Sequence, residues 1–455
     1  MQATTEGERS PLLSAAAPAL WLSGRGVWLL LALALLLALA SVVPVLLYLF
    51  AAAVTLAGAL LAADAALGPS PVTLRVRRRP LPLLALRRPA AVTYDIENRA
   101  DVAVRLGIVE TPVETIDFAQ DGVTVELAAH SATTLELAFT TRERGLVHFD
   151  SLYLWVENRI GLLRRRFRVE GAADARVFPD LSAVESYGTL AKRSTLLDAG
   201  LRRLRLLGAG SEFESLREYQ AGDAFRLVDW KATARRGKMM VTQYQIERSQ
   251  NVILALDCGR LLTPRIGLQR KFDYVLTAAL SIARVAQQAG DNTGLLAFAA
   301  KPVLEIAPRR GAAHVAALAR SAYDLQPRFE EPDYETTFSE LKRRYGKRSL
   351  IVFFTDIFDP VTSAAVLAGL ASVAARHLVM CVLMNDTAIE TALEVEPRTP
   401  KDAYRSAVAM SLSDERAKAV AVLRSRGIII VDVPAPKLTL ALLDAYLDVK
   451  ARGAL

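Results

Sequence analysis

Two aspartates lie where a parallel β-sheet commonly places a ligand site. Asp257 ends the apolar run 251–257, and Asp356 ends the apolar run 348–356. Ligands of open α/β sheets bind at the carboxyl ends of the strands, so the two carboxylates are the most site-like feature of this half of the chain. Alternatively, each aspartate only caps the turn or helix that follows its strand. Both interpretations stay open at the level of the sequence.

A second unusual stretch is SLREYQAGDAFRLVDWKATARRGKMM, residues 215–240. Charges of both signs alternate there around the aromatics Tyr219, Phe225 and Trp230. Oppositely charged residues lie near each other in sequence, Arg217 with Glu218, and Asp229 with Arg226 and Lys231. Partly buried pairs of this kind are suited to joining two domains. The alternative role, which does not exclude the first, is a docking surface with Trp230 and the arginines as anchors.

The motifs of common enzyme classes are missing from the sequence. It contains no GxxxxGK[ST] phosphate loop and no GxSxG elbow, and no strand pattern precedes GAGSEF at 208–213 as a dinucleotide fingerprint requires. The four histidines are scattered along the chain, at His130, His148, His314 and His377. Neither a catalytic triad nor a histidine metal site is therefore indicated, and we expect a non-enzymatic protein without a cofactor.

The carboxylates Asp257 and Asp356 belong to a region that alternates strands and helices. Near-continuous apolar runs typical of buried parallel strands occur at 251–257, 292–298, 348–356, 377–384 and 427–433. Helical spacing separates them, most clearly at 270–289 and 413–426. The pattern predicts an α/β fold with a doubly wound parallel sheet.

An N-terminal region without charges predicts a membrane anchor. No charged residue occurs from Gly26 to Ala63, and one helix of that length would measure about 57 Å, nearly twice the roughly 30 Å of bilayer hydrocarbon. Pro44 lies near the middle of the region and disfavours a continuous helix. We expect two short spans, 27–43 and 45–63, folded as a transmembrane helical hairpin. A single long tilted helix is the alternative.

Arginines flank the uncharged region and orient it. Arg25 precedes the first span, and a cluster follows the second at Arg75, Arg77, Arg78, Arg79, Arg87 and Arg88. Positive flanks stay in the cytoplasm, so both ends are expected to face inward, with the arginines near anionic lipid. The net charge of +8 is better explained by this contact than by nucleic-acid binding, because no nucleic-acid-binding motif accompanies it.

Residues 71–180 alternate apolar and polar side chains in short runs separated by turn residues, which predicts a small β-sandwich. The two cysteines, Cys258 and Cys381, lie in apolar runs and indicate buried, reduced thiols in a cytoplasmic setting. The predicted organisation is a cytoplasmic tail (1–26), a transmembrane hairpin (27–67), a β-sandwich-like domain (71–180), a signature linker (181–250) and an α/β domain (251–455).

With these pieces in place, the chain resembles the domain-of-unknown-function 58 family. The segment GSEFESLREYQAGDAFRLVDWKATARRGKMMVTQYQIE is similar to the family's REY..GD..R.IDW..SAR signature, and WVENRIGLLRRRF at 155–167 is a looser match to its DPFGLF turn. Members are membrane-anchored bacterial proteins whose C-terminal half looks like a von Willebrand factor A domain. The resemblance therefore implies an A-type fold for residues 251–455.

The resemblance also implies a metal site and a partner. Ion-binding A-type domains use DxSxS, a threonine and a second aspartate, which are hard oxygen donors suited to Mg²⁺. Asp257, Thr337 and Asp356 match three of these donors, but Gly259 and Leu261 replace both serines. A degenerate site that binds Mg²⁺ weakly at best is the expectation.

Family members are commonly paired with MoxR-type AAA+ ATPases, and the resemblance implies such a partner here. The candidate partner-binding residues are Arg217, Asp223, Arg226, Asp229 and Trp230, together with the carboxylates Asp257 and Asp356. The function expected from the resemblance is a non-enzymatic membrane adaptor or co-chaperone at the bacterial inner membrane. The alternative is a metal-dependent hydrolase or adhesin that uses the two carboxylates.

Overall fold

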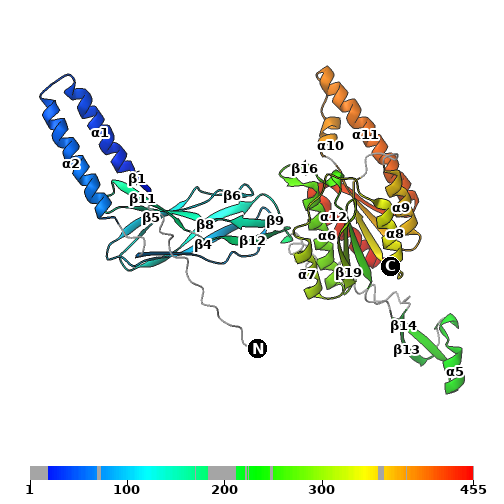
Figure 1. The fold of residues 1–455 in the computed structure, drawn as a ribbon. Coiled ribbons are helices and arrows are strands. Elements are labelled where there is room, and N and C mark those ends of the chain that lie inside the picture. The colour runs from blue at the N-terminus through cyan, green and yellow to red at the C-terminus, as the bar shows by residue number, and fades with distance from the viewer. Residues whose placement is uncertain are drawn as a thin grey trace. The chain divides into compact units, whose positions relative to one another are not determined.

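The computed structural model describes residues 19–68, 73–169, 171–182, 212–220, 223, 225–245, 250–356, 363–385 and 387–453. The chain divides into two compact units, Met1–Phe178 and Pro179–Leu455. Their elements are labelled in Figure 1, and each unit is described by itself.

The first unit is rich in β-strands. They are β1 (Ala19–Leu22), β2 (Leu74–Arg78), β3 (Leu84–Ala85), β4 (Pro89–Asn98), β5 (Val104–Glu110), β6 (Ile116–Phe118), β7 (Val123–Leu127), β8 (Ala132–Thr141), β9 (Gly145–Phe149), β10 (Leu152–Glu157), β11 (Leu163–Val169) and β12 (Ala173–Phe178). Their sheets have the orders β1-β11-β10-β5-β7, β2-β4-β8-β6 and β3-β12-β9. One hydrophobic core joins the sheets, because the inward side chains of β4, β5, β8, β10 and β11 all belong to it.

The uncharged region forms two helices, α1 (Gly24–Ala40) and α2 (Leu46–Ala66), with Pro44 in the break between them. The alternative of one continuous helix is therefore wrong. The two helices lie side by side (Figure 1). By length and composition, α2 qualifies as a membrane span, whereas α1 is apolar but shorter.

The loop between β10 and β11 holds the ends of both apolar helices. Asp64, in the last turn of α2, is fully buried, and its carboxylate accepts backbone N–H bonds from Ile160 at 2.7 Å, Leu162 at 2.9 Å and Leu163 at 2.8 Å. Ser23, the N-cap of α1, donates its N–H to the carbonyl of Leu162 at 2.8 Å and its hydroxyl to that of Gly161. The loop therefore fixes the start of α1 and the end of α2 at one place.

Replacing Asp64 by alanine is expected to loosen this loop. Three backbone N–H groups lose a charged acceptor, which costs on the order of 3 kcal/mol. The amides of Ile160, Leu162 and Leu163 should exchange with solvent about a hundredfold faster, measured by hydrogen–deuterium exchange on the full chain in detergent. Asp121→Ala, at an exposed position of the same unit, is the control, and unchanged exchange in Asp64→Ala would refute the role of this carboxylate.

The second unit contains a six-stranded sheet with the order β19-β18-β15-β20-β21-β22. The strands are β15 (Asn251–Asp257), β18 (Asn292–Phe298), β19 (Pro302–Arg309), β20 (Leu350–Phe354), β21 (Leu378–Asn385) and β22 (Ile429–Pro434). Five are parallel, and β19 runs antiparallel to β18 at one edge. The five predicted strand runs are confirmed, and β19 was not predicted.

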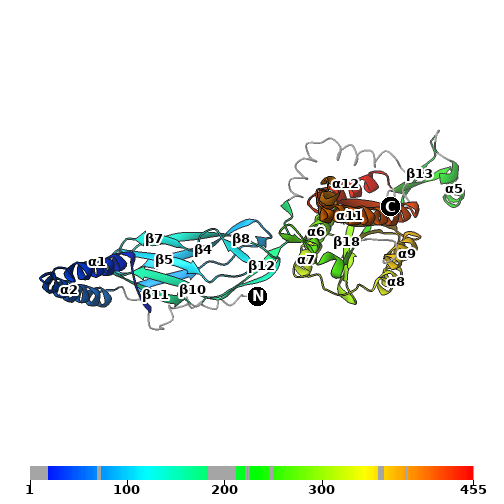
Figure 2. The same cartoon turned by 90° about the horizontal axis from the view of Figure 1, so that it is seen from above.

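Helices cover both faces of this sheet. They are α6 (Lys271–Gln288), α7 (Ala312–Ala322), α8 (Tyr334–Arg344), α9 (Ala364–Ala374), α10 (Thr387–Glu394), α11 (Pro400–Ser425) and α12 (Leu438–Ala451). Residues of β15 alternate between the two cores: Val252, Leu254 and Leu256 pack with α6, α7 and α12, whereas Ile253 and Ala255 pack with α8, α9 and α11. Figure 2 shows α6 and α7 on one side of β18, and α8 and α9 on the other.

The order of the sheet places the strand-end aspartates beside each other. Numbered along the chain, the strands follow the sequence 3-2-1-4-5-6, in which the winding direction reverses between the first and the fourth strand. These two strands are β15 and β20, and they pair in parallel, with Leu256 opposite Phe354. Such a reversal opens a crevice at the carboxyl ends of the two strands, and Asp257 and Asp356 lie there.

Candidate functional site at the carboxyl edge of the sheet

Asp257 is held by hydrogen bonds from three directions. Its Oδ1 accepts the N–H of Gly259 at 2.7 Å, and its Oδ2 accepts the hydroxyls of Tyr334 and Thr355, each at 2.7 Å. Burial raises the pKa of the Asp257 carboxyl, while these three hydrogen bonds lower it, and the net shift is upward. Asp257 is 0% exposed. Its buried carboxylate, at the end of β15, is joined by the Thr355 hydroxyl to the end of β20.

Asp356 is the centre of a buried ion-pair network. Its Oδ2 accepts the Lys271 ammonium at 2.9 Å, and its Oδ1 accepts the Arg416 guanidinium at 2.8 Å. Arg416 also donates to Asp432 at 3.0 Å and to the carbonyl of Met384 at 2.9 Å. The network therefore connects the ends of β20, β21 and β22 with the first turn of α6 and the middle of α11.

The side chains at the predicted metal site do not fit a divalent ion. Thr337, a predicted donor, directs its hydroxyl to the carbonyl of Asp333 one helical turn earlier, at 2.7 Å. Where ion-binding A-type domains have their first serine, a β-carbon on Gly259 would lie 2.2 Å from Cγ of Pro332, so no serine side chain has room there. Among the described residues, no group of three or more His, Cys, Asp or Glu side chains is arranged to hold a metal.

Both carboxylates are also inaccessible to a partner. Asp257 is 0% and Asp356 1% exposed, which removes them from the predicted docking surface. The hydrogen-bond donors to the two carboxylates were not predicted from the sequence: Tyr334 and Thr355 for Asp257, and Lys271 and Arg416 for Asp356. Only Lys271 carried a signal: a cation in the first turn of a helix opposes the helix dipole, so it calls for a nearby anion.

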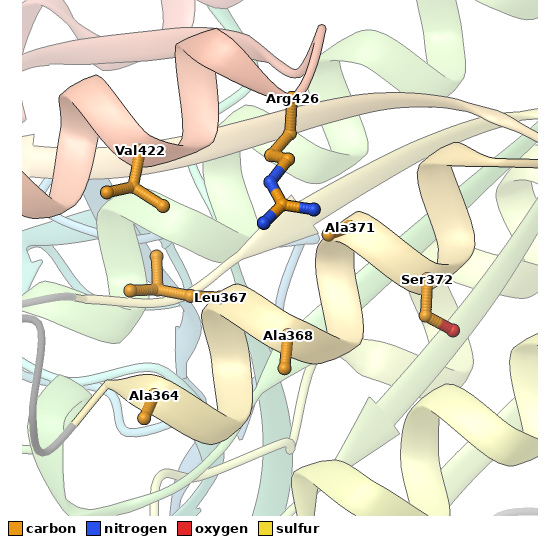
Figure 3. Close-up of a pocket in the computed structure, with 7 residues that line it drawn as sticks. All are labelled: Ala364, Leu367, Ala368, Ala371, Ser372, Val422 and Arg426. Atoms are coloured by element: carbon orange, nitrogen blue, oxygen red, sulfur yellow. The ribbon is translucent and has the colours of Figure 1, made fainter.

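A groove of about 550 Å³ lies on this domain between α9 and α11 (Figure 3). Its lining is Ala364, Leu367, Ala368, Ala371, Ser372, Val422 and Arg426. None of these residues belongs to the strand-end network. The lining offers apolar side chains, the Ser372 hydroxyl and the Arg426 cation, without an acid or base that could perform catalysis.

The signature stretch 212–245 forms a small antiparallel module. Strands β13 (Glu212–Glu218) and β14 (Met240–Gln245) pair, and the short helix α5 (Trp230–Arg236) lies between them in the chain. Asp229 caps α5 by accepting the N–H groups of Lys231 at 3.0 Å and Ala232 at 2.9 Å. Gly237 ends the helix at φ 67°, a left-handed conformation that favours glycine.

Arg217 and Glu218 both have charged partners inside this module, but they do not pair with each other as predicted. Arg217 makes a two-pronged pair with Asp223, at 2.8 and 2.6 Å, and Glu218 pairs with Lys238 at 3.0 Å. The Arg217 guanidinium holds the pKa of Asp223 below its ordinary value. The side chain of Arg226 lies outside the described residues. A tie between the two domains through this stretch stays a prediction.

Two aromatics of the module, Phe225 and Trp230, are exposed. Phe225 and Trp230 are each 64% exposed, although the ring centroids of Tyr219 and Phe225 lie 5.8 Å apart. Exposed cations follow Trp230 along α5 and the turn after it: Lys231, Arg235, Arg236 and Lys238. Exposed aromatics on a hydrogen-bonded framework are typical anchors of protein interfaces.

Two substitutions test whether Asp229 stabilises the module and whether Trp230 contributes nothing to its packing. Asp229→Ala removes the cap of α5, costs about 1 kcal/mol, and should speed amide exchange in α5 by roughly fivefold. Trp230→Ala should leave the exchange of β14 within about twofold, because the indole is mostly exposed. Hydrogen–deuterium exchange on the full chain measures both. Loss of β14 protection in Trp230→Ala would make Trp230 a packing residue and remove it as an anchor.

Comparison with known proteins supports the predicted resemblance over part of the chain. Residues 215–414 match the family described as "Protein of unknown function DUF58". The match begins in the signature module and includes β15 to β21 with Asp257 and Asp356, but it ends before Arg416 and covers less of the chain than the sequence resemblance suggested.

The matching curated relatives are uncharacterised proteins. Mb1516 of Mycobacterium bovis and Rv1480 of Mycobacterium tuberculosis are 26% identical over 181 residues, which cover 39% of this chain and 56% of theirs. The chain thus matches just over half the length of these relatives. YeaD of Bacillus subtilis is 44% identical over 43 residues, 10% of this chain and 11% of its own.

Solved structures with similar parts are remote from this chain. Escherichia coli alpha-2-macroglobulin has a TM-score of 0.19 at 16% identity, covering 24% of this chain and 7% of that one. A PapD-like domain of human CEP192 has a TM-score of 0.18 at 11% identity, covering 24% of this chain and 87% of the domain.

Proposed function

We propose that this chain is a membrane-anchored, non-enzymatic adaptor that presents a von Willebrand factor A-like domain to a MoxR-type AAA+ ATPase. The proposal rests on the module 212–245. Asp223 and Asp229 accept hydrogen bonds from within this module, whereas Phe225 and Trp230 are exposed. Because hydrogen bonds within the module stabilise it, the exposed aromatics are available to a partner.

The sheet supports an A-type interpretation of the domain. Five parallel strands with an antiparallel edge, in the order 3-2-1-4-5-6 and covered on both faces, form the doubly wound arrangement that the resemblance implies. The two aspartates at the reversal point are buried and hydrogen-bonded. A hydrolase would need one of them in contact with substrate and water, so the geometry favours the adaptor over the alternative enzyme.

The proposed anchor is a transmembrane hairpin of α1 and α2. Apolar side chains exposed along both helices suit them to lipid. Because the β10–β11 loop binds the start of α1 and the end of α2, both ends of the pair lie on one side. The arginines near those ends favour the cytoplasmic side, where ATP and a AAA+ partner are available.

The anchor predicts a topology that reporters can measure. Fusions of a reporter active only in the cytoplasm, one after Gly7 and one after Leu455, should both be active. An active N-terminal reporter with a silent C-terminal one would contradict the hairpin, because one span places the two ends on opposite sides of the membrane.

The docking surface makes a second prediction. Truncation of a central interface aromatic commonly costs about 2 kcal/mol, roughly thirtyfold in affinity, so Trp230→Ala should weaken binding of the full chain in detergent to its ATPase by about that factor. Arg142→Ala is the matched control, because Arg142 is exposed and pairs with Asp117 in the first unit. Biolayer interferometry with the MoxR-type ATPase encoded nearest to this chain provides the measurement.

The outcomes of this binding experiment are separable. Equal binding by Trp230→Ala and Arg142→Ala would place the docking surface elsewhere. No binding by the wild-type chain at tens of micromolar, with or without ATP, would overturn the adaptor proposal itself.

A further inference from the structure

The carboxyl edge of the α/β sheet contains its own cations. The Lys271 ammonium lies 2.9 Å from Asp356, and the side chains of the pair are 3% and 1% exposed. The Arg416 side chain, 12% exposed, approaches the other oxygen of the same carboxylate at 2.8 Å. Asp356 therefore has a cationic partner on each oxygen, away from water.

We propose that Lys271, supported by Arg416, takes the structural place of a divalent cation at this edge. A cation at the reversal point would join the β20 carboxylate to the β15–α6 connection by charge. Lys271 makes the same link, because it stands in the first turn of α6 and reaches the carboxylate that follows β20. The domain then needs no ion to hold the two segments together.

The surroundings of Lys271 agree with this role. A lysine at a helix N-terminus meets the positive end of the helix dipole and is desolvated when buried, and both effects are unfavourable. The Asp356 carboxylate offsets them. Pro332 fills the space that a side chain at position 259 would need, so the loop has no room for the hydroxyl ligand of an ion site.

Because the charges at this buried edge balance one another, the domain should fold whether or not divalent ions are present. The inference concerns the folding of the domain and does not depend on the proposed partner.

The two cysteines give a readout specific to this domain. Cys258 and Cys381 are the only cysteines of the chain, and both are 0% exposed in the α/β core. Burial also raises the pKa of the Cys381 thiol, which keeps it unreactive in the folded state. A dye that fluoresces on reacting with thiols therefore reports the thermal unfolding of this domain in the full chain, in detergent.

In this assay, Lys271→Met should lower the midpoint by roughly 5–10 °C, because it leaves a buried charge partly uncompensated while keeping an apolar stem. Lys301→Met, at an exposed position of the same domain, should change it by about 1 °C or less. Adding Asp356→Asn to Lys271→Met should recover part of the loss, because the carboxylate that needs the cation is gone.

Metal removal completes the test. The wild-type midpoint should move by no more than about 1 °C between EDTA and about 5 mM MnCl₂, since an ion that bound the folded domain would stabilise it. A rise of several degrees with Mn²⁺ would overturn the inference. A midpoint of Lys271→Met equal to that of Lys301→Met would also overturn it. So would a double variant with no higher midpoint than Lys271→Met, because Lys271 would then act by packing and not by its charge. None of these outcomes depends on whether the chain binds an ATPase.

Discussion

The α/β domain depends on the neutralisation of one buried carboxylate. Asp356 lies where the winding of the sheet reverses, and a lone anion there would be strongly unfavourable. Its two partners come from different elements, Lys271 from α6 and Arg416 from α11, and Arg416 continues to Asp432 on β22. One charge therefore fixes how a helix on each face meets the edge of the sheet. This edge is also where α/β domains usually bind ligands, and here it is filled by the protein's own side chains.

In the first unit, backbone N–H groups stabilise another buried carboxylate. Asp64 is buried at the end of α2, and the N–H groups of the β10–β11 loop surround its carboxylate. The loop lies in the stretch 155–167 and joins the apolar helices to the β-sheets. In both units, a buried carboxylate connects segments far apart in the sequence.

Much of this fold follows from patterns in the sequence. The apolar runs predicted five strands of the α/β sheet to within three residues at each end, and Pro44 predicted the break between α1 and α2. The strand-end positions of Asp257 and Asp356 were also predictable, because strand ends are local features. Their partners were not: Lys271 and Arg416 lie 85 and 60 residues from Asp356, and no local pattern encodes such a pairing. For the same reason, the sequence suggested Glu218 as the partner of Arg217, whereas the hairpin brings Asp223 into place. Spacing in the sequence also does not give the exposure of a side chain: the predicted docking surface included Trp230, but the two carboxylates are buried and leave it, whereas the exposed Phe225 joins it.

We propose that this protein acts by surface recognition rather than by chemistry at the carboxylates. Affinity purification of the full chain from detergent-extracted membranes, with mass spectrometry of what copurifies, tests that claim most directly. A AAA+ ATPase of the MoxR type should be enriched with the wild-type chain and depleted with Trp230→Ala, although both chains are recovered folded. An ATPase signal at background level with the wild-type chain, or equal recovery with the two chains, would contradict the account.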